Sequence, residues 1–233
     1  MRTELRGTTV VHQDDRATHS MLLLDGWMAL SKMLPDGDIQ IIDIMLPGDF
    51  ALIGARHAPV AACSVEALSN VQFVDISATA ANGYERHMDE LRDFLAAEIV
   101  VTQARTSELL LRMGKGAAAT RVAYALLELY IRLDAIGLVR DGACFDFPLT
   151  QQQLGSFVGL SSVHVCRTLR RFERGGIVSY PTRTSIRLDD PNQLCEIAEV
   201  DLDALKGSIL VHRESGITAV RQSLPGSGPQ APR

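Results

Sequence analysis

The chain has 233 residues, of which 46% are hydrophobic, 22% charged and 5% aromatic, and its formal net charge is −5. This apolar fraction is typical of a globular protein and excludes a largely disordered chain, and the length allows one or two domains. The sequence lacks the roughly 18 consecutive apolar residues of a membrane span, and its polar, acidic N-terminus does not resemble a signal peptide. We therefore expect a cytoplasmic protein that does not contact a membrane.

The cysteines are scattered along the chain and include no Cys-x-x-Cys pair; they are Cys63, Cys144, Cys166 and Cys195. Disulfide frameworks and zinc sites usually show regular cysteine spacing. The pattern therefore favours buried thiols in a reducing cytoplasm, and it predicts no metal site.

Charge is distributed unevenly along the chain. Residues 1–81 carry five basic and ten acidic side chains, a balance of −5. Residues 150–188 carry a single acid, Glu173, and six arginines: Arg167, Arg170, Arg171, Arg174, Arg183 and Arg187. A short basic segment in an acidic chain indicates a local contact with a polyanion.

Short apolar runs of strand length occupy the first third of the chain, from about residue 5 to residue 76. They are Val10–Val11, Met21–Leu24, Trp27–Leu30, Ile39–Met45, Cys63–Val65 and Val71–Ile76. Turn-forming residues separate them, and the Pro-Asp-Gly-Asp stretch at residues 35–38 is a hairpin signal. Several short strands at this spacing predict an antiparallel β-roll, a jelly roll of the cupin type.

Near residue 84 the apolar period changes to that of an α-helix. Apolar positions from Met88 to Met113 recur every three or four residues, and Gly114 to Gly116 mark the end. A second stripe of Phe94, Val101 and Leu110 lies beside the first. Two interpretations remain open: a core helix packed on the roll, or a helix that also packs on a second copy of the chain.

The remaining helical patterns are shorter. Residues 117–136 predict a second amphipathic helix that ends at Gly137, and residues 193–205 predict a short helix after Pro191. The last residues are rich in glycine and proline, so we expect a flexible tail over residues 206–233.

The most specific pattern in the chain is LTQQQLGSFVGLSSVHVCRTLRRFER at residues 149–174. Thr150 is a good N-cap for a short helix over residues 151–158, in which Leu154 and Val158 face inward.

A second helix follows closely in the same segment. Gly159 suits the positive φ of a tight turn, and Ser161 is positioned to cap the next helix. That helix has a buried stripe of Val165, Leu169 and Phe172. A short helix, a glycine turn and a capped second helix predict a helix-turn-helix motif, and residues 175–188 predict a β-hairpin wing after it.

The exposed face of the second predicted helix carries candidate base-reading residues, which are Ser162, Val163, Arg167 and Arg170. Arginine can bind guanine O6 and N7, and valine can contact the methyl group of thymine. Candidates for phosphate contacts are Thr150, Gln152, Ser161 and His164. The competing interpretation is that the arginines form an ordinary solvated helix face.

These features resemble the CRP/FNR family of bacterial transcription regulators over roughly residues 7–205. The resemblance is loose in the roll, at Gly7, Asp25-Gly26 and Pro47–Phe50, and close over Leu149–Arg174. It implies four regions: a β-roll sensor (residues 1–82), a dimerisation helix (83–114), a winged helix-turn-helix DNA-binding domain (115–205) and the tail (206–233). It also implies a homodimer that binds double-stranded DNA and contacts RNA polymerase.

The resemblance assigns base-reading roles to three positions, Ser162, Val163 and Arg167. Only Arg167 keeps the residue that is common in the family, whereas Val163 stands where glutamate is frequent. The resemblance therefore implies that this chain reads a different DNA sequence from that of the best-known members.

The sequence leaves the effector and cofactor unknown. Cyclic-nucleotide-binding relatives carry a Gly-Glu step and an Arg-Ser/Thr-Ala step, and residues 50–63 contain neither, which disfavours cAMP. Cys63 alone cannot replace the four ligands of an iron–sulfur cluster. The separated His12, His19 and His57 do not support a haem or metal site, and a redox role for Cys63 or Cys166 is open beside that of an inert thiol.

The patterns favour a homodimeric, sequence-specific DNA-binding regulator that binds an inverted repeat and responds to a signal in the roll. The alternative is a ligand-binding signalling module that acts through protein contacts. We do not expect an enzyme, because the chain has no glycine-rich phosphate loop, no H-E-x-x-H and no G-x-S-x-G.

Overall fold

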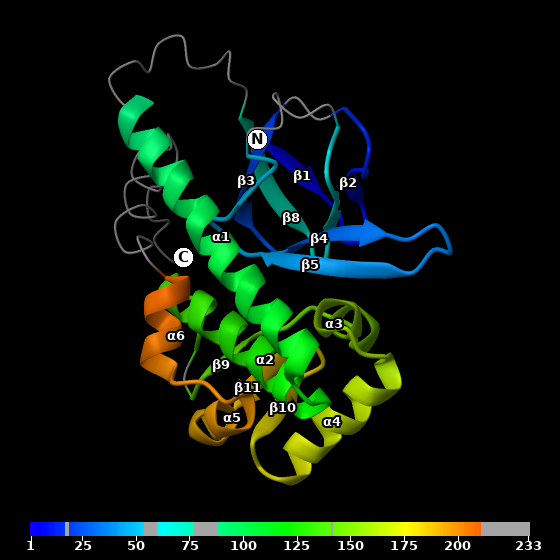
Figure 1. Cartoon of the computed structure of the whole chain (residues 1–233), viewed down its shortest axis with the longest axis vertical. Coiled ribbons are helices and arrows are strands. Elements are labelled where there is room, and N and C mark those ends of the chain that lie inside the picture. Colours follow the sequence, from blue (N-terminus) through cyan, green and yellow to red (C-terminus); the bar gives the residue numbers. More distant parts are fainter. Residues whose placement is uncertain (17–18, 54–59, 77–87, 141, 211–233) are drawn as a thin grey trace, which may run out of the picture.

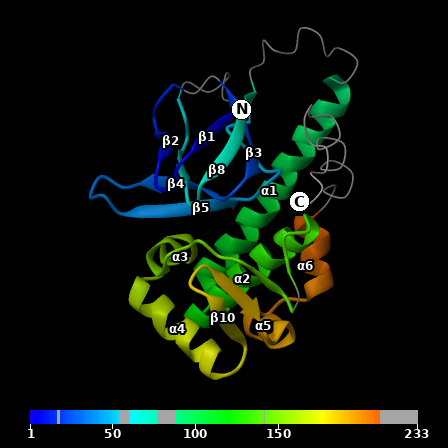
Figure 2. The same cartoon turned by 180° about the vertical axis from the view of Figure 1, so that it is seen from behind.

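The computed structural model describes residues 1–16, 19–53, 60–76, 88–140 and 142–210. A β-roll and a winged helix-turn-helix head lie at opposite ends of the molecule, and one long helix runs beside both (Figures 1 and 2). The fold class predicted from the sequence is confirmed. Within the described ranges, no helix is long and apolar enough to cross a membrane.

The roll consists of two four-stranded antiparallel sheets. The first has the order β1-β8-β3-β6, with bounds Arg2–Glu4, Val71–Ile76, Ser20–Asp25 and Phe50–Ala51. The second has the order β2-β7-β4-β5, with bounds Thr9–Val11, Ser64–Ala67, Met28–Met33 and Ile39–Met45. Each predicted apolar run overlaps one strand, whereas β1 consists of polar residues and β6 has only two residues.

The β4–β5 hairpin is buried on both faces at the end away from its turn. Met28 pairs with Met45, and both belong to the core between the two sheets. The next pair, Ala29 with Ile44, belongs to the core shared with the helical head. Burial on both faces explains why Ile39–Met45 is a nearly continuous apolar run rather than an alternating one.

The turn of this hairpin has the predicted chemistry. Gly37 has a φ of +92°, a conformation that side chains rarely adopt. The backbone N–H of Asp38 donates to the Asp36 carboxylate at 3.1 Å. The aspartate side chain therefore stabilises the turn locally, as expected of Asp in such positions.

Two long helices connect the roll to the head. The first, α1, spans Met88–Lys115 and the second, α2, spans Ala118–Ala135. The glycine-marked ends of both helices are confirmed, while the predicted start near residue 84 lies outside the described residues. One face of α1 is buried through Val101 and Leu109. The other is apolar yet between 51% and 67% exposed, through Ile99, Val100, Leu110 and Leu111.

The head follows α2 and contains the predicted motif. Its helices are α3 (Gln151–Val158) and α4 (Ser162–Arg174). Its antiparallel sheet has the order β10-β11-β9, with bounds Val178–Thr182, Ser185–Leu188 and Cys144–Asp146. The hairpin β10–β11 is the predicted wing, and it packs beside α4.

The C-terminal helix predicted over residues 193–205 is wrong in its extent, because the chain forms two helices there. These are α5 (Pro191–Ala198) and α6 (Leu202–Ile209). Glu199 adopts a left-handed conformation that ends α5, and the Asp201 carboxylate caps α6 by accepting from Ala204 N–H at 2.8 Å. Ile209 is fully buried, so the folded chain extends past residue 205, where the flexible tail was expected to begin.

A buried cluster of charges joins the roll to α1 and α2. It contains the six buried charged side chains of the described residues, namely Asp43, Asp49, Glu98, Arg105, Glu128 and Arg132. Arg132 of α2 donates to the Asp49 carboxylate and to the Ile44 carbonyl of the roll, each at 2.6 Å. Arg105 of α1 donates to the Asp43 carboxylate at 2.8 Å.

Four carboxyl groups and two guanidinium groups share this cluster, and their pKa values differ accordingly. Burial raises the pKa of Glu128 and of Glu98, and the arginines offset this only in part. Burial also opposes ionisation of Asp43, but Arg105 and Arg132 together lower the pKa of that carboxyl below its usual value. The cluster therefore favours the ionised form of Asp43, whereas it shifts the pKa values of the two glutamates in the opposite direction.

Candidate nucleic-acid interface

The first helix of the motif begins at a complete capping box. Gln153 N–H donates to the Thr150 hydroxyl at 3.1 Å, and Thr150 N–H donates to the Gln153 side-chain oxygen at 3.0 Å. These two bonds fix where α3 starts, as the sequence predicted for Thr150. The side-chain oxygen of Thr150 therefore already has a structural partner.

The turn between α3 and α4 depends on two glycines. Gly159 has a φ of +66°, and a Cβ there would lie 2.9 Å from the methyl carbon of Met113. At Gly155 a Cβ would lie 2.4 Å from the backbone oxygen of Leu160. A side chain at Gly155 would collide with the backbone of the turn, so this glycine allows the two helices to pack closely, whereas Gly159 is favoured by its positive φ.

The start of α4 is capped by Ser161. Its hydroxyl accepts weakly from His164 N–H at 3.4 Å and lies 2.9 Å from His164 Nδ1. The inner face of α4 is fixed as predicted, because Val165, Leu169 and Phe172 are all buried. These contacts leave the opposite face of α4 with no packing partner among the described residues.

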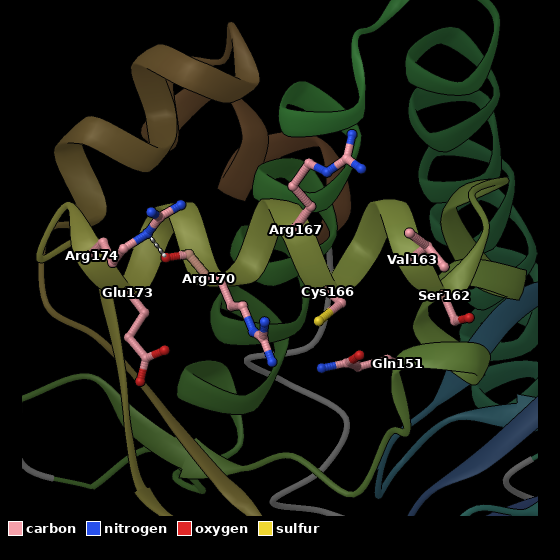
Figure 3. A pocket seen from close by; sticks show the side chains of 8 residues that line it. All are labelled: Gln151, Ser162, Val163, Cys166, Arg167, Arg170, Glu173 and Arg174. Carbon is pink, nitrogen blue, oxygen red and sulfur yellow. Dashed lines mark hydrogen bonds between the residues drawn. The ribbon is translucent and has the colours of Figure 1, made fainter.

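That outer face presents two rows of side chains (Figure 3). Val163 and Arg167 extend along one edge of α4, while Ser162, Cys166 and Arg170 extend along the other. Gln151, the first residue of α3, lies opposite Cys166. Together with Glu173 and Arg174 these side chains line an open hollow of about 810 Å³.

The hollow is basic because its arginines have no acidic partners. Within the part of the chain that the structure describes, Arg167, Arg170 and Arg174 form no ion pair. Arg174 instead donates to the backbone oxygen of Arg170 at 3.2 Å. Unpaired guanidinium groups around a hollow are suited to bind phosphates and the acceptor atoms of guanine.

A second groove lies between the wing and α3. It measures about 440 Å³, and its lining includes Thr150, Tyr180, Arg183 and Thr184. Burial, together with nearby Glu173, raises the pKa of Tyr180 to about 12. The phenol therefore stays neutral at physiological pH, and Arg183 supplies the positive charge at the wing tip.

All eight predicted site residues are exposed, and the structure brings four of them together. Ser162, Val163, Arg167 and Arg170 line the hollow on α4. Thr150 lines the groove beside the wing, whereas the remaining three lie on the surface near the two helix starts; these are Gln152, Ser161 and His164. Gln151 was missed, although its place directly after the Thr150 cap puts it at the exposed start of α3.

Comparisons with known proteins agree with this architecture. The cyclic nucleotide-binding domain family matches residues 2–83, and the Crp-like helix-turn-helix domain family matches residues 120–197. The nitrogen fixation regulation protein FixK of Bradyrhizobium diazoefficiens is 31% identical over 199 residues, which cover 82% of this chain and 79% of that protein. The chain belongs to the CRP/FNR family. It is therefore a DNA-binding transcription regulator.

Other CRP/FNR regulators match along most of their length. The transcriptional activator FnrL of Cereibacter sphaeroides is 24% identical, with 87% of this chain and 82% of that protein covered. The solved structure of FixK2 from Bradyrhizobium japonicum superimposes with a TM-score of 0.72 at 22% identity, covering 84% of this chain and 95% of that one. A CRP-family regulator from Thermus thermophilus, TTHB099, gives a TM-score of 0.70 at 20% identity, covering 88% of this chain and all of that one.

The roll of this CRP/FNR regulator does not present the partners of a cyclic nucleotide among its described residues. A buried cyclic phosphate needs a cationic partner, usually an arginine. The described core between the two sheets is apolar, and its largest side chains are Met21, Leu23, Met28, Met45 and Phe73. Arg56 and His57 lie outside the described residues.

The described residues also contain no group of three His, Cys, Asp or Glu side chains that could hold a metal ion. Burial raises the pKa of the Cys63 thiol, which keeps it protonated and weakly nucleophilic. Cys144 is buried too, whereas Cys166 and Cys195 are partly exposed, so the expectation of buried thiols is confirmed for two of the four.

Proposed function

We propose that this regulator acts as a homodimer in which each α4 helix enters the major groove of one half of an inverted-repeat operator. The observation that carries the proposal is the outer face of α4, where unpaired arginines surround a hollow on a helix fixed by its cap and its buried stripe. Ser162, Val163, Arg167 and Arg170 are assigned to base edges. The phosphate contacts are assigned to Thr150, Gln152, Ser161 and His164.

The exposed apolar face of α1 supports the dimer. Two of its residues, Ile99 and Leu110, are joined by the polar Gln103 and Thr106 into a row with steps of four, three and four residues, the spacing of a helix–helix seam. They border a shallow groove of about 390 Å³ between α1 and the roll, whose lining includes Phe50 and Leu52. A second α1 packed on this face would remove four exposed aliphatic side chains from water.

The regions keep the roles assigned from the sequence. Residues 1–82 form the sensor and 83–114 the dimerisation helix, while the DNA-binding domain expected over 115–205 extends to the end of α6 at Ile209 and the tail follows it. A signal received by the roll changes the relative position of the two heads, and bound dimers contact RNA polymerase. The protein acts in the cytoplasm and catalyses no reaction.

The first test is a selection from random double-stranded oligonucleotides with the full-length protein, with and without a small-molecule cell extract as a source of effector. We expect an enriched inverted repeat. Replacing Arg167 by alanine is expected to cost about 1–3 kcal/mol at that operator and to relax base choice at one position per half-site. The control is Arg2→Ala, which removes an exposed arginine of the roll.

Two results would overturn the proposal. If no sequence is enriched under either condition, the protein is not a sequence-specific DNA reader, and the alternative of a signalling module becomes the better account. If the Arg167 variant weakens all sequences equally, Arg167 contacts phosphate rather than a base.

The dimer has a separate test. Leu110→Glu places a charge on the exposed face of α1, so sedimentation velocity should show a shift from dimer to monomer. Leu138→Glu is the matched control, because Leu138 is also exposed but lies outside α1. If the two variants sediment equally, the dimer contact lies on another surface.

A further inference from the structure

Val163 is an apolar side chain that the fold does not use. It is 63% exposed and belongs to neither of the two buried apolar clusters of the described residues. It lies in the first turn of α4, with exposed polar residues on either side in the sequence. An exposed valine in a basic, polar face contributes little to folding, and its methyl groups are free to contact a ligand.

The neighbours of Val163 limit what its row can recognise. Arg167 lies four residues further along α4 and extends along the same edge of the helix (Figure 3). Side chains spaced in this way are about 5–6 Å apart at their Cβ atoms, a separation that spans one to two base pairs. The row therefore faces neighbouring bases of the same groove.

Neither side chain in this row can accept a hydrogen bond. Arginine only donates, and valine neither donates nor accepts. The amino groups of adenine and cytosine need an acceptor, whereas guanine O6 and N7 suit arginine and the thymine methyl group suits an alkyl side chain. The single acid of the hollow, Glu173, lies at the opposite end of α4 from Val163.

We propose that Val163 determines sequence specificity by contacting the 5-methyl group of a thymine, next to the guanine that Arg167 binds in each half-site. This inference rests on the proposed function and adds to it the chemistry of two bases. The row recognises the keto bases, thymine by its methyl group and guanine by its two acceptors.

The test uses the operator obtained by selection, with single thymines replaced by deoxyuridine. This replacement removes one methyl group and leaves base pairing unchanged. We expect one position per half-site at which wild-type protein loses about fourfold in affinity, the value of one buried methyl group. That position should lie one or two base pairs from the guanine whose recognition Arg167→Ala relaxes.

Variants at Val163 decide which side chain is responsible. Val163→Ala should bind the thymine and deoxyuridine operators almost equally, and Val163→Thr, which keeps one methyl group, should retain part of the discrimination. Leu138→Ala, which shortens an exposed aliphatic side chain outside α4, is the control and should discriminate as the wild type does. Because Val163 is exposed, these variants are expected to fold, which circular dichroism can verify.

Each other outcome overturns the inference. If no thymine in the half-site is sensitive to loss of its methyl group, Val163 reads no thymine, although the regulator still binds its operator. If Val163→Ala discriminates as strongly as wild type, another side chain makes the contact. If wild-type protein selects no sequence at all, the proposed function fails and this inference fails with it.

Discussion

Arginine side chains of this molecule occupy two contrasting environments, one buried and one exposed. Arg105 and Arg132 are 3% and 0% exposed and lie within 4 Å of carboxylates from the roll and from α2. Arg167 and Arg170 are exposed on α4 and have no carboxylate partner in the described part of the chain. The same side chain therefore joins elements of the fold in one region and remains available for a ligand in the other.

The difference has a thermodynamic basis. A buried arginine without a counter-charge is very costly, so it persists only where several carboxylates surround it. An exposed arginine keeps its hydration and contributes little to folding, but it can release counterions from DNA when it binds a phosphate. The charge of the buried cluster thus affects stability, and that of α4 affects binding.

The largest expected effect comes from breaking the buried cluster. Arg132→Met leaves Asp49 and Glu128 without their main counter-charge, and we expect a loss of about 3–5 kcal/mol in the free energy of unfolding. Urea denaturation of the full-length wild-type and variant proteins measures this loss. A loss below about 1 kcal/mol would place this cluster in the same class as exposed ion pairs.

The second prediction concerns how the free energy of unfolding depends on pH in the acidic range. The lowered pKa of Asp43 contributes stability that is present above its ordinary value of 3.8 and is lost as the pH falls through its folded value. The raised pKa of Glu128 acts in the opposite sense, because stability rises as the pH falls through the folded pKa toward the ordinary value of 4.5. Urea unfolding across this range should show a maximum in weak acid.

A matched variant separates the two contributions. Glu128→Gln should remove much of the rise between neutral pH and weak acid while the loss below pH 4 remains. An unchanged profile in this variant would mean that Glu128 does not titrate in the folded protein over this range.

The third prediction concerns the exposed arginines. Arg170→Ala should leave the free energy of unfolding within about 0.5 kcal/mol of the wild-type value. If Arg170 contacts phosphate instead of a base edge, affinity falls about equally on all sequences and the slope of log K against log salt decreases by about 1. Binding measured at several salt concentrations, on specific and random DNA, distinguishes the two roles.

The smallest effect is expected at an exposed ion pair. Arg140 and Asp146 are joined at 2.6 Å, but their side chains are 60% and 70% exposed. Asp146→Ala should therefore change the free energy of unfolding much less than Arg132→Met does, despite the short distance. A loss comparable to that of Arg132→Met would show that distance rather than burial governs these pairs.

The helix-turn-helix was predictable because its signals are local. The Thr150 cap, the Gly159 turn and the buried stripe of α4 each depend on residues within a few positions, and all three are confirmed. The boundary between α5 and α6 was missed because it depends on Glu199, a residue type that rarely adopts a left-handed conformation.

The buried cluster could not be predicted from the sequence. Arg105 and Asp43 are 62 residues apart, and Arg132 and Asp49 are 83 residues apart. An arginine in an amphipathic helix pattern normally indicates a solvated position, so only the fold shows that these side chains are internal. The roles assigned to the eight site residues stay predictions, since exposure alone does not identify their partners.

The double-sided burial of the β4–β5 hairpin has a consequence for how this regulator can be divided. Trp27 and Ile44 of the roll pack into the same core as α2 and the head. A fragment that begins after α1 would expose this apolar surface to water, and Arg132 would lose its partners in the roll, Asp43 and Asp49. The roll and the DNA-binding head should therefore unfold in a single cooperative transition. The head expressed alone should aggregate rather than fold independently.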